Sequence, residues 1–101
     1  MRDEKQYYVY LLTNFTNSTI YTCVTNNLIG RVMQHRDKAN AGFTNRYNVW
    51  KLVYFEHTRE VYSALEREKQ IKAGSRKAKV ALVESTNPKG RDLYPELLEG
   101  G

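Results

Sequence analysis

The fold is decided by residues 7–24, which read YYVYLLTNFTNSTIYTCV. Residues 7–12 form a β-rich apolar run and residues 20–24 form a second one, so both are predicted to be buried strands. The segment between them, residues 14–18, is polar and contains two asparagines, which favours a turn. Two strands joined by so short a connection predict an antiparallel hairpin.

The chain after this hairpin predicts three helices and one further strand. We expect helices from Asn26 or Asn27 to about Lys38, over about residues 60–73 and from Ser75 to about Ser85, and a third strand over residues 51–56. Thr58 and Ser75 are the expected N-caps of the second and third helices, and Gly74 ends the second. The order β-β-α-β-α-α predicts the α+β class, a three-stranded sheet with helices packed on it.

A chain of 101 residues accommodates one hydrophobic core, so we expect a single domain over residues 7–86. Residues 1–6 are interpreted as an N-terminal extension and residues 39–48 as a polar loop. Residues 87–91 are typical of a turn, which predicts that residues 87–101 form a loosely packed C-terminal tail.

The composition excludes several classes of protein. Hydrophobic residues make up 41% of the chain and charged residues 27%, which is typical of a globular domain and argues against disorder. No apolar run approaches the ~20 residues of a membrane span, and the polar first residues predict no secretory signal. The single Cys23 forms no internal disulfide, and one thiol with two histidines gives no zinc-site spacing. We therefore expect a cytoplasmic protein that does not associate with membranes.

An excess of positive charge indicates a nucleic-acid partner. Sixteen Lys and Arg against eleven Asp and Glu give a net charge of +5, and eight residues are tyrosines. Cations contact phosphates, and aromatic rings stack on bases. The cations gather between Arg67 and Lys79, where six of them accompany one acid. We predict phosphate contacts for Lys72, Arg76 and Lys77, against the alternative that this helix face is simply solvated.

Glu68 interrupts the apolar pattern of the second predicted helix. The apolar positions of that helix are Val61, Ala64, Leu65 and Ile71. The helical period places position 68 on the same stripe. A carboxylate that faces inward loses hydration and must find a cation, a metal ion or hydrogen-bond donors. Glu68 is therefore either a functional carboxylate or an edge residue that pairs with a nearby Lys or Arg.

Arg31 and His35 share one face of the first predicted helix because they lie four residues apart. The apolar stripe of that helix consists of Leu28, Ile29, Val32 and Met33. The pair flanks this stripe, so neither side chain is expected to point fully to solvent. An Arg fork suits phosphate oxygens, and a His moves protons near neutral pH. The alternative is a surface Arg beside a partly buried His.

Tyr10 and Tyr21 lie on the two strands of the predicted hairpin and can project from the same face. The alternative is that both are ordinary aromatic residues of a sheet. Cys23 is conceivable as a nucleophile, but a thiol needs a nearby base to lower its pKa, and the local sequence supplies none.

Together these residues resemble the GIY-YIG nuclease superfamily. Its two name-giving tripeptides correspond to Tyr8-Val9-Tyr10 and Tyr21-Thr22-Cys23, and Arg31 follows the second tyrosine by ten residues, a usual spacing in the family. Residues 64–72 resemble the helical motif that carries the family's single catalytic glutamate. The chain resembles the small stand-alone bacterial branch of this family at residues 42–44, 47–49, 51–54 and 75–77. The match extends over roughly residues 7–95.

The resemblance implies a three-stranded antiparallel sheet flanked by helices, and it implies a shared active site. Tyr10 and Tyr21 are then the paired catalytic tyrosines, with Tyr21 assisting the attacking water. Arg31 holds the scissile phosphate, His35 relays a proton or contacts phosphate, and Glu68 ligates one Mg²⁺ or Mn²⁺ ion. One carboxylate is enough for Mg²⁺ when waters and substrate phosphate complete its shell.

The function implied is a divalent-metal-dependent DNA endonuclease with little sequence specificity, acting on branched, nicked or single-stranded DNA. The sequence departs from the family at Cys23, where the family has glycine, and a Cβ and sulfur there crowd any close backbone approach. The alternative is therefore a weak or inactive nucleic-acid-binding module on the same scaffold. A domain that binds only other proteins is a third alternative, which the net charge disfavours.

Overall fold

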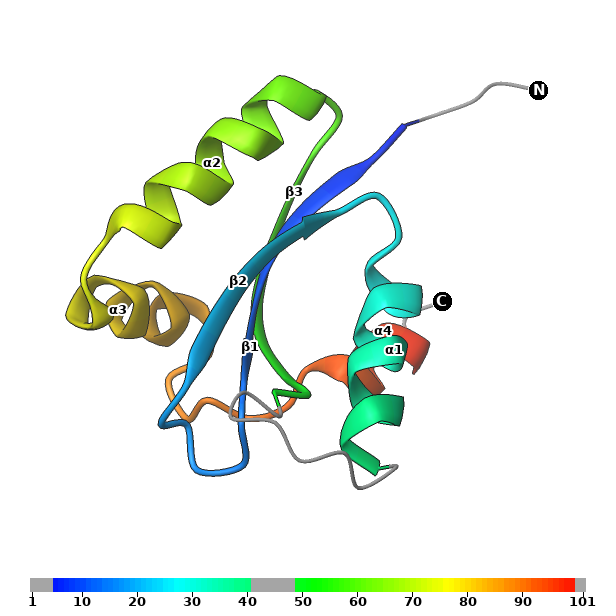
Figure 1. The fold of residues 1–101 in the computed structure, drawn as a ribbon, viewed down its shortest axis with the longest axis vertical. Helices are drawn as coiled ribbons and strands as arrows, with labels where there is room; N and C mark the ends of the chain where they lie inside the picture. Colours follow the sequence, from blue (N-terminus) through cyan, green and yellow to red (C-terminus); the bar gives the residue numbers. More distant parts are fainter. Residues whose placement is uncertain (1–4, 41–48, 100–101) are drawn as a thin grey trace.

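The computed structural model describes residues 5–40 and 49–99 (Figure 1). Its elements are β1 (Tyr7–Thr13), β2 (Ile20–Thr25), α1 (Leu28–Asn40), β3 (Lys51–Thr58), α2 (Val61–Ala73), α3 (Arg76–Thr86) and α4 (Tyr94–Glu99). The strands form one antiparallel sheet in the order β2-β1-β3. The predicted α+β class, the sheet and the order of the first six elements are confirmed. Of the predicted loop, residues 39 and 40 belong to α1, and residues 41–48 lie outside the described residues.

Helices cover both faces of the sheet, with α2 and α3 on one face and α1 and α4 on the other (Figure 1). β1 is the central strand and is buried on both faces, which explains why residues 7–12 are continuously apolar rather than alternating. The two longest helices of the described residues, α1 and α2, have 13 residues each, and no helix there is long and apolar enough to cross a membrane.

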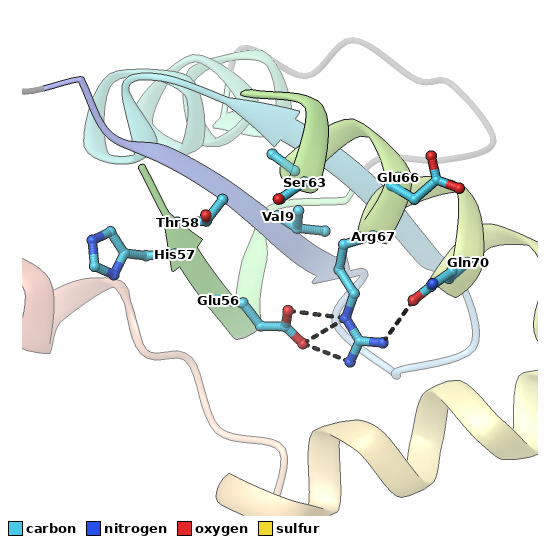
Figure 2. A pocket seen from close by; sticks show the side chains of 9 residues that line it. Val9, Glu56, His57, Thr58, Ser63, Glu66, Arg67 and Gln70 are labelled. Atoms are coloured by element: carbon cyan, nitrogen blue, oxygen red, sulfur yellow. Dashed lines mark hydrogen bonds and ion pairs between the residues drawn. The ribbon is translucent and has the colours of Figure 1, made fainter. Parts of the chain in front are cut away.

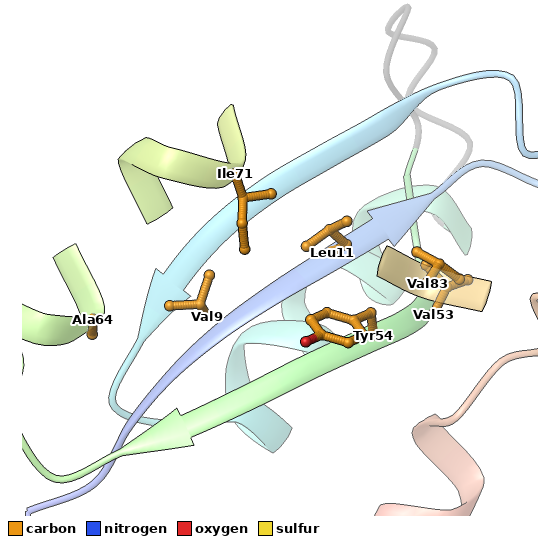
Figure 3. Close-up of a cluster of buried hydrophobic side chains, with 7 residues drawn as sticks. All are labelled: Val9, Leu11, Val53, Tyr54, Ala64, Ile71 and Val83. Atoms are coloured by element: carbon orange, nitrogen blue, oxygen red, sulfur yellow. The ribbon is translucent and has the colours of Figure 1, made fainter. Parts of the chain in front are cut away.

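Two apolar clusters join the helices to the sheet. The cluster under α2 and α3 consists of Val9, Leu11, Val53, Tyr54, Ala64, Ile71 and Val83 (Figure 3). The cluster under α1 and α4 consists of Tyr10, Leu12, Leu28, Val32, Val49, Leu52 and Tyr94. Successive residues of β1 thus alternate between the two clusters, as the pleat of a strand requires. Each fully buried large side chain stabilises the fold by about 1.5–3 kcal/mol, so both clusters are needed to fix the sheet.

Asn27 determines where α1 begins. Its side-chain Oδ1 accepts a hydrogen bond from the backbone N–H of Gly30 at 3.1 Å, which satisfies one of the free donors of the first turn. Glycine inside a helix is unfavourable by about 1 kcal/mol relative to Ala. A Cβ at position 30 would collide with the Asn27 side chain. Gly30 therefore allows the cap to form.

The predicted caps of the next two helices have different outcomes. Ser75 caps α3 as predicted, because its hydroxyl accepts a hydrogen bond from the N–H of Ala78 at 3.0 Å. The prediction for Thr58 is wrong, since α2 begins after Glu60, whose side chain makes no capping hydrogen bond. Thr58 instead ends β3, which runs past its predicted end because its pairing with β1 continues as far as Tyr7.

The C-terminal segment is packed on the domain, so the prediction of a loose tail is wrong. Tyr94 of α4 is buried in the cluster under α1. Asn87 is also buried, and its side chain donates hydrogen bonds to the carbonyls of Val53 at 3.0 Å and Arg91 at 2.9 Å. Local composition does not reveal these contacts, because the partner strand lies far away in the sequence.

Asp92 anchors this segment to the rest of the molecule. One carboxylate oxygen accepts a hydrogen bond from Arg36 at 2.7 Å, and the other accepts from the backbone N–H groups of Leu52 at 3.2 Å and Tyr94 at 3.1 Å. The Arg36 guanidinium lies over the Tyr94 ring, 4.5 Å from its centroid. One side chain thereby joins α1, β3 and the start of α4.

We expect Asp92→Ala to lower the free energy of unfolding by about 2–4 kcal/mol, because its loss leaves a cation and two backbone donors without their acceptor. Urea denaturation followed by circular dichroism measures the change. Glu96→Ala is the matched control, since the ion pair of Glu96 with Arg91 is half exposed and is expected to contribute less than about 1 kcal/mol. If both variants are equally stable, Asp92 does not have this anchoring role.

Candidate active site

The edge strand β2 lies between the two helices that carry the predicted site residues. α1 covers one face of the sheet and α2 covers the other, and α2 contacts both β1 and β2 (Figure 1). Arg31 and His35 lie four residues apart on α1, and Glu68 and Lys72 lie four residues apart on α2. Ring contacts of His35 and the electrostatic influence of Lys72 both reach Tyr21 of β2. The two helix sides therefore converge on one edge of the sheet.

Tyr10, Tyr21 and Cys23 project from the face of the sheet that α1 covers. Tyr10 and Cys23 are cross-strand partners, and Tyr21 precedes Cys23 by two residues, so all three side chains lie together. The shared face predicted for the two tyrosines is confirmed. Tyr10 is fully buried, whereas Tyr21 is 42% exposed. Tyr21 is the phenol that a substrate in solution can reach.

Both phenols are held in the protonated form. Burial is the main cause of the raised pKa of Tyr10, and the neighbouring Cys23 raises it further. Charge on Cys23 is the largest cause of the raised pKa of Tyr21. The Tyr10 hydroxyl is buried and has no hydrogen-bond partner among the described residues. Near neutral pH both tyrosines are therefore neutral phenols rather than tyrosinate bases.

Cys23 itself is half-buried, and burial raises the pKa of its thiol. A thiol with a raised pKa holds little thiolate near neutral pH, and the thiolate is the nucleophilic form. This argues against Cys23 as a nucleophile. The sulfur instead lies beside the two phenols and influences the pKa of both.

His35 lies next to Tyr21, with the two ring centroids 6.1 Å apart in an edge-to-face arrangement. Burial lowers the pKa of His35, and the positive charge of Arg31 lowers it further. The imidazole is therefore neutral at neutral pH. A neutral imidazole can accept a proton, which suits a residue beside a protonated phenol.

The apolar stripe of α1 is narrower than predicted. Leu28 and Val32 are buried, whereas Ile29 and Met33 are exposed. The sheet covers only the side of the helix centred on the two buried residues, and both flanks remain open to solvent. Arg31 lies on one flank and is exposed, whereas His35 is half-buried. An exposed guanidinium is free to meet a phosphate.

Glu68 is paired with a cation, as one of its two interpretations predicted. Its side chain is only 18% exposed, and its carboxylate forms an ion pair with Lys72 at 3.1 Å. Leu65, on the same side of α2, is 40% exposed, so this side faces the rim of the sheet rather than the core. Burial is the main cause of the raised pKa of Cys23, and the charges of Lys72 and Glu68 also act on that thiol. The Glu68 carboxylate therefore acts electrostatically on the β2 side chains across the edge of the sheet.

Arg67, the first cation of the basic run, is engaged on the opposite side of α2. Its guanidinium pairs with Glu56 of β3 at 2.7 Å, beside a cavity of about 360 Å³ between β3 and α2 (Figure 2). Gln70 accepts a further hydrogen bond from the same guanidinium at 3.3 Å (Figure 2). The sequence contains no local signal for this pair, because Glu56 and Arg67 lie on different elements.

The three residues predicted to contact phosphate differ in whether their side chains already bind other groups of the protein. Lys72 pairs with Glu68, a partner detectable in the sequence from the spacing of four residues. Arg76 donates hydrogen bonds to two backbone carbonyls of the β1–β2 turn, at 2.8 and 2.6 Å. Lys77 is exposed at the start of α3. Phosphate binding by these residues stays a prediction, and two of the three also hold the protein's own groups.

Comparison with known proteins identifies the family. A sequence profile of the GIY-YIG catalytic domain matches residues 6–81, which include the two tyrosines, Arg31, His35 and Glu68. The chain belongs to the GIY-YIG family. Its domain is therefore of the nuclease type, and nucleic acid is the substrate class that this domain implies.

Relatives of similar size share this GIY-YIG domain. The chain is 34% identical over 90 residues to a UPF0213 protein of Clostridium perfringens, covering 89% of this chain and 96% of that protein. A UPF0213 protein of Syntrophus aciditrophicus is 37% identical over 82 residues, covering 80% and 92%. The solution NMR structure of a UPF0213 protein from Bacillus halodurans matches with a TM-score of 0.55 at 25% identity, covering 83% of this chain and 88% of that chain. The predicted GIY-YIG fold in its small single-domain form is confirmed.

Few metal ligands are present at the β2 edge. Within residues 5–40 and 49–99, no three His, Cys, Asp or Glu side chains gather into a group that could hold a metal ion. Glu68 offers one carboxylate, and Lys72 occupies one of its oxygens. A lone carboxylate fits Mg²⁺, which keeps several waters, and does not fit a structural zinc site. A divalent cation at Glu68 would therefore lie close to the Lys72 ammonium, whose positive charge opposes its binding.

We expect Cys23→Gly to lower the pKa of Tyr21, because charge on the Cys23 sulfur is the largest cause of its elevation. ¹³C NMR of the tyrosine Cζ atoms, titrated from about pH 8 to 12, measures the change. Tyr54 is an internal control, since burial and its hydrogen bond with Glu56 raise its pKa to about 12 without any part played by Cys23. An unshifted Tyr21 titration in the variant would rule out this coupling.

Proposed function

We propose that the protein is a divalent-metal-dependent endonuclease that hydrolyses phosphodiester bonds of DNA at the β2 edge. The observation that carries this proposal is the convergence of Tyr21 and His35 with the Glu68–Lys72 pair at one edge of a GIY-YIG domain. The net charge of +5 favours a polyanionic substrate. A domain of this size has little room for reading base edges, so we expect little sequence specificity.

Arg31 and Glu68 supply the charges in the proposed mechanism. The exposed Arg31 guanidinium binds two oxygens of the scissile phosphate and offsets the negative charge that develops during the reaction. Glu68 would hold Mg²⁺ or Mn²⁺, and such an ion neutralises phosphate charge and acidifies a water when it is bound. Lys72 lies next to Glu68 and would contact a neighbouring phosphate.

Tyr21 and His35 handle the proton. Tyr21 is protonated, so it orients the attacking water by a hydrogen bond. It can accept a proton from that water only if it transfers its own hydroxyl proton to another group. His35 is neutral and lies next to the Tyr21 ring, which makes it the proton acceptor in this proposal. Tyr10 is too deeply buried to touch substrate, and we assign it a positioning role beneath Cys23.

Cleavage assays test this function. The purified protein is incubated with supercoiled plasmid, nicked and branched DNA, single-stranded DNA and an RNA hairpin, each with Mg²⁺, with Mn²⁺ and with EDTA. Metal-dependent cutting of DNA is the expected result. Cutting of RNA alone would overturn the assignment of DNA, and failure to bind any nucleic acid at about 50 mM salt would overturn the proposal as a whole.

One observation favours a second function, a nucleic-acid-binding module with weak or no cleavage. Cys23 replaces the glycine of the family motif, and its side chain lies beside Tyr10 and Tyr21. A phenol crowded by this sulfur is a poor partner for the attacking water. Salt-sensitive DNA binding without cutting is the result expected of such a module, and restored cutting in Cys23→Gly would locate the defect.

We expect Lys72→Met to tighten Mn²⁺ binding by about 2- to 5-fold, because the ion and the ammonium compete for the Glu68 carboxylate and the exposed ion pair is worth up to about 1 kcal/mol. Paramagnetic broadening of backbone amide NMR signals, followed during a Mn²⁺ titration, measures the affinity without any DNA. Lys69→Met is the matched control, as Lys69 is an exposed cation of the same helix. Loss of broadening in Glu68→Gln with no change in Lys72→Met would show that Lys72 does not compete.

A further inference from the structure

Phe15 is an apolar side chain in an unusual place. It lies at the tip of the β1–β2 turn and is 77% exposed, the highest value among the large hydrophobic residues of the described chain. An exposed aromatic residue is not by itself informative. The construction and the electrostatic surroundings of this turn are what indicate a use for it.

The turn is held rigidly by its own polar side chains. The Asn14 carbonyl oxygen Oδ1 accepts hydrogen bonds from the backbone N–H groups of Ser18 at 2.8 Å and Thr19 at 3.2 Å. The Asn14 amide donates to the Ser18 hydroxyl at 2.7 Å. Asn17 adopts a left-handed backbone conformation with φ of 63°, which Asn tolerates better than most residues. Phe15 is therefore displayed on a preformed loop rather than a floppy one.

Helix α3 fixes the turn from outside. Arg76 donates hydrogen bonds to the carbonyl oxygens of Ser18 at 2.8 Å and Asn17 at 2.6 Å. Thr13, the last residue of β1, donates to the Asn17 side chain at 2.9 Å. Because the loop is already ordered, a ligand that docks on it loses little affinity to the ordering of the loop.

The surroundings of the turn are predominantly cationic. Arg76 touches the turn directly, and Lys77 is the next residue of α3. Lys89 lines the same small cavity as Asn17, together with one acid, Glu84. An exposed aromatic ring on a loop with cations nearby suits single-stranded nucleic acid, because bases stack on rings and phosphates contact the charges.

The turn is also close to the proposed catalytic edge. Thr13 and Ile20 form the last pair of the β1–β2 ladder; Phe15 lies two residues beyond this pair and Tyr21 one residue inside it. With a rise of about 3.3 Å per strand residue, the backbones at Phe15 and Tyr21 are on the order of 10–15 Å apart. A strand a few nucleotides long spans that distance.

We propose that Phe15 is a stacking platform for an unpaired base a few nucleotides from the phosphate held at the β2 edge. This inference rests on the proposed nuclease function and specifies its substrate class. A duplex keeps its bases stacked on one another, so only DNA with an unpaired stretch beside the cleavage point, such as a flap, a gap or a single strand, engages Phe15.

Binding measurements with Phe15→Ser test the proposal. Fluorescence anisotropy in EDTA compares labelled oligo(dT), a flapped duplex and a blunt duplex. We expect Phe15→Ser to bind oligo(dT) and the flap about 5- to 100-fold more weakly, as stacking on one aromatic ring is worth about 1–3 kcal/mol, and to bind the blunt duplex as the wild type does. Tyr62→Ser is the matched control, because Tyr62 is a similarly exposed aromatic residue at 75% on the distant helix α2.

A second variant reports stacking directly. Phe15→Trp retains an aromatic ring, and its fluorescence is expected to be quenched by oligo(dT) beyond the response of wild-type protein, whose only tryptophan is Trp50. If wild-type protein binds oligo(dT) but Phe15→Ser binds equally well, Phe15 is not a base platform and an apolar surface of a protein partner becomes the better occupant. If wild-type protein binds no nucleic acid, the proposed function itself fails, and the inference falls with it.

Discussion

Glu68→Gln is expected to reduce DNA cleavage by at least about 10³-fold while the protein stays folded. Glutamine keeps the shape of the side chain but loses the negative charge that would hold a divalent cation. Such an ion supplies several kcal/mol of transition-state stabilisation, and about 1.4 kcal/mol corresponds to a factor of ten in rate. Because the Lys72 ammonium is 56% exposed, it is rehydrated when its partner is neutralised, so the fold should lose little.

Rates are measured by nicking of supercoiled plasmid with saturating Mg²⁺, and thermal unfolding verifies the fold. Glu66→Gln is the matched control, since Glu66 lies two residues earlier and lines the cavity on the β3 side of α2 (Figure 2). That control should cut like the wild type. Full activity in Glu68→Gln would remove Glu68 from the mechanism, and activity in both this variant and an Arg31 variant would indicate a contaminating nuclease.

Arg31→Met is expected to lower kcat/KM by about 10³-fold. An arginine that stabilises charge on a transferring phosphoryl group is worth about 10³–10⁵ in rate, and Arg31 is exposed on the helix beside the proposed site. Arg31→Lys keeps the charge and loses the planar fork, so it should retain an intermediate activity. The larger change is expected in kcat rather than KM, because the interaction strengthens as charge develops.

Single-turnover cleavage separates the chemical step from binding in these variants. Arg91→Met is the matched control, as Arg91 is an exposed arginine that pairs with Glu96 in the C-terminal segment. It should leave kcat unchanged. An Arg31→Met protein that binds DNA more weakly but cleaves bound DNA at the wild-type rate would make Arg31 a binding residue only.

The regular elements were predictable because their signals are local. The apolar run at residues 7–12 has the length and composition of a central strand, and it is one. Ser75 is a good N-cap at the start of a helical pattern, and it caps α3. The shared face of Tyr10 and Tyr21 follows from the two-residue period of paired strands.

Contacts between distant elements were not predictable in this way. Residues 87–101 look like a polar tail in the sequence, yet Asn87 and Asp92 bind the edge of β3. Arg36 has no ion-pair partner on α1 itself, and its partner Asp92 lies 56 residues later in the sequence. Hydrogen bonds of this kind depend on which surfaces the fold brings together, and a local sequence pattern does not indicate which distant surfaces will meet.

The candidate site also combines features that local sequence determines with features that depend on the fold. The amino-acid sequence by itself determined the fold family, the residue types of the candidate site and the placement of Glu68 on or beside the apolar stripe of its helix, because each of these depends on neighbours within a few residues. Only the tertiary structure decided that α1 and α2 flank the β2 edge from the two faces of the sheet, that Arg31 is exposed, and that burial lowers the pKa of His35 beside Tyr21. Exposure and pKa are set by burial and by charges across the gap between elements, and those quantities exist only once the chain has folded.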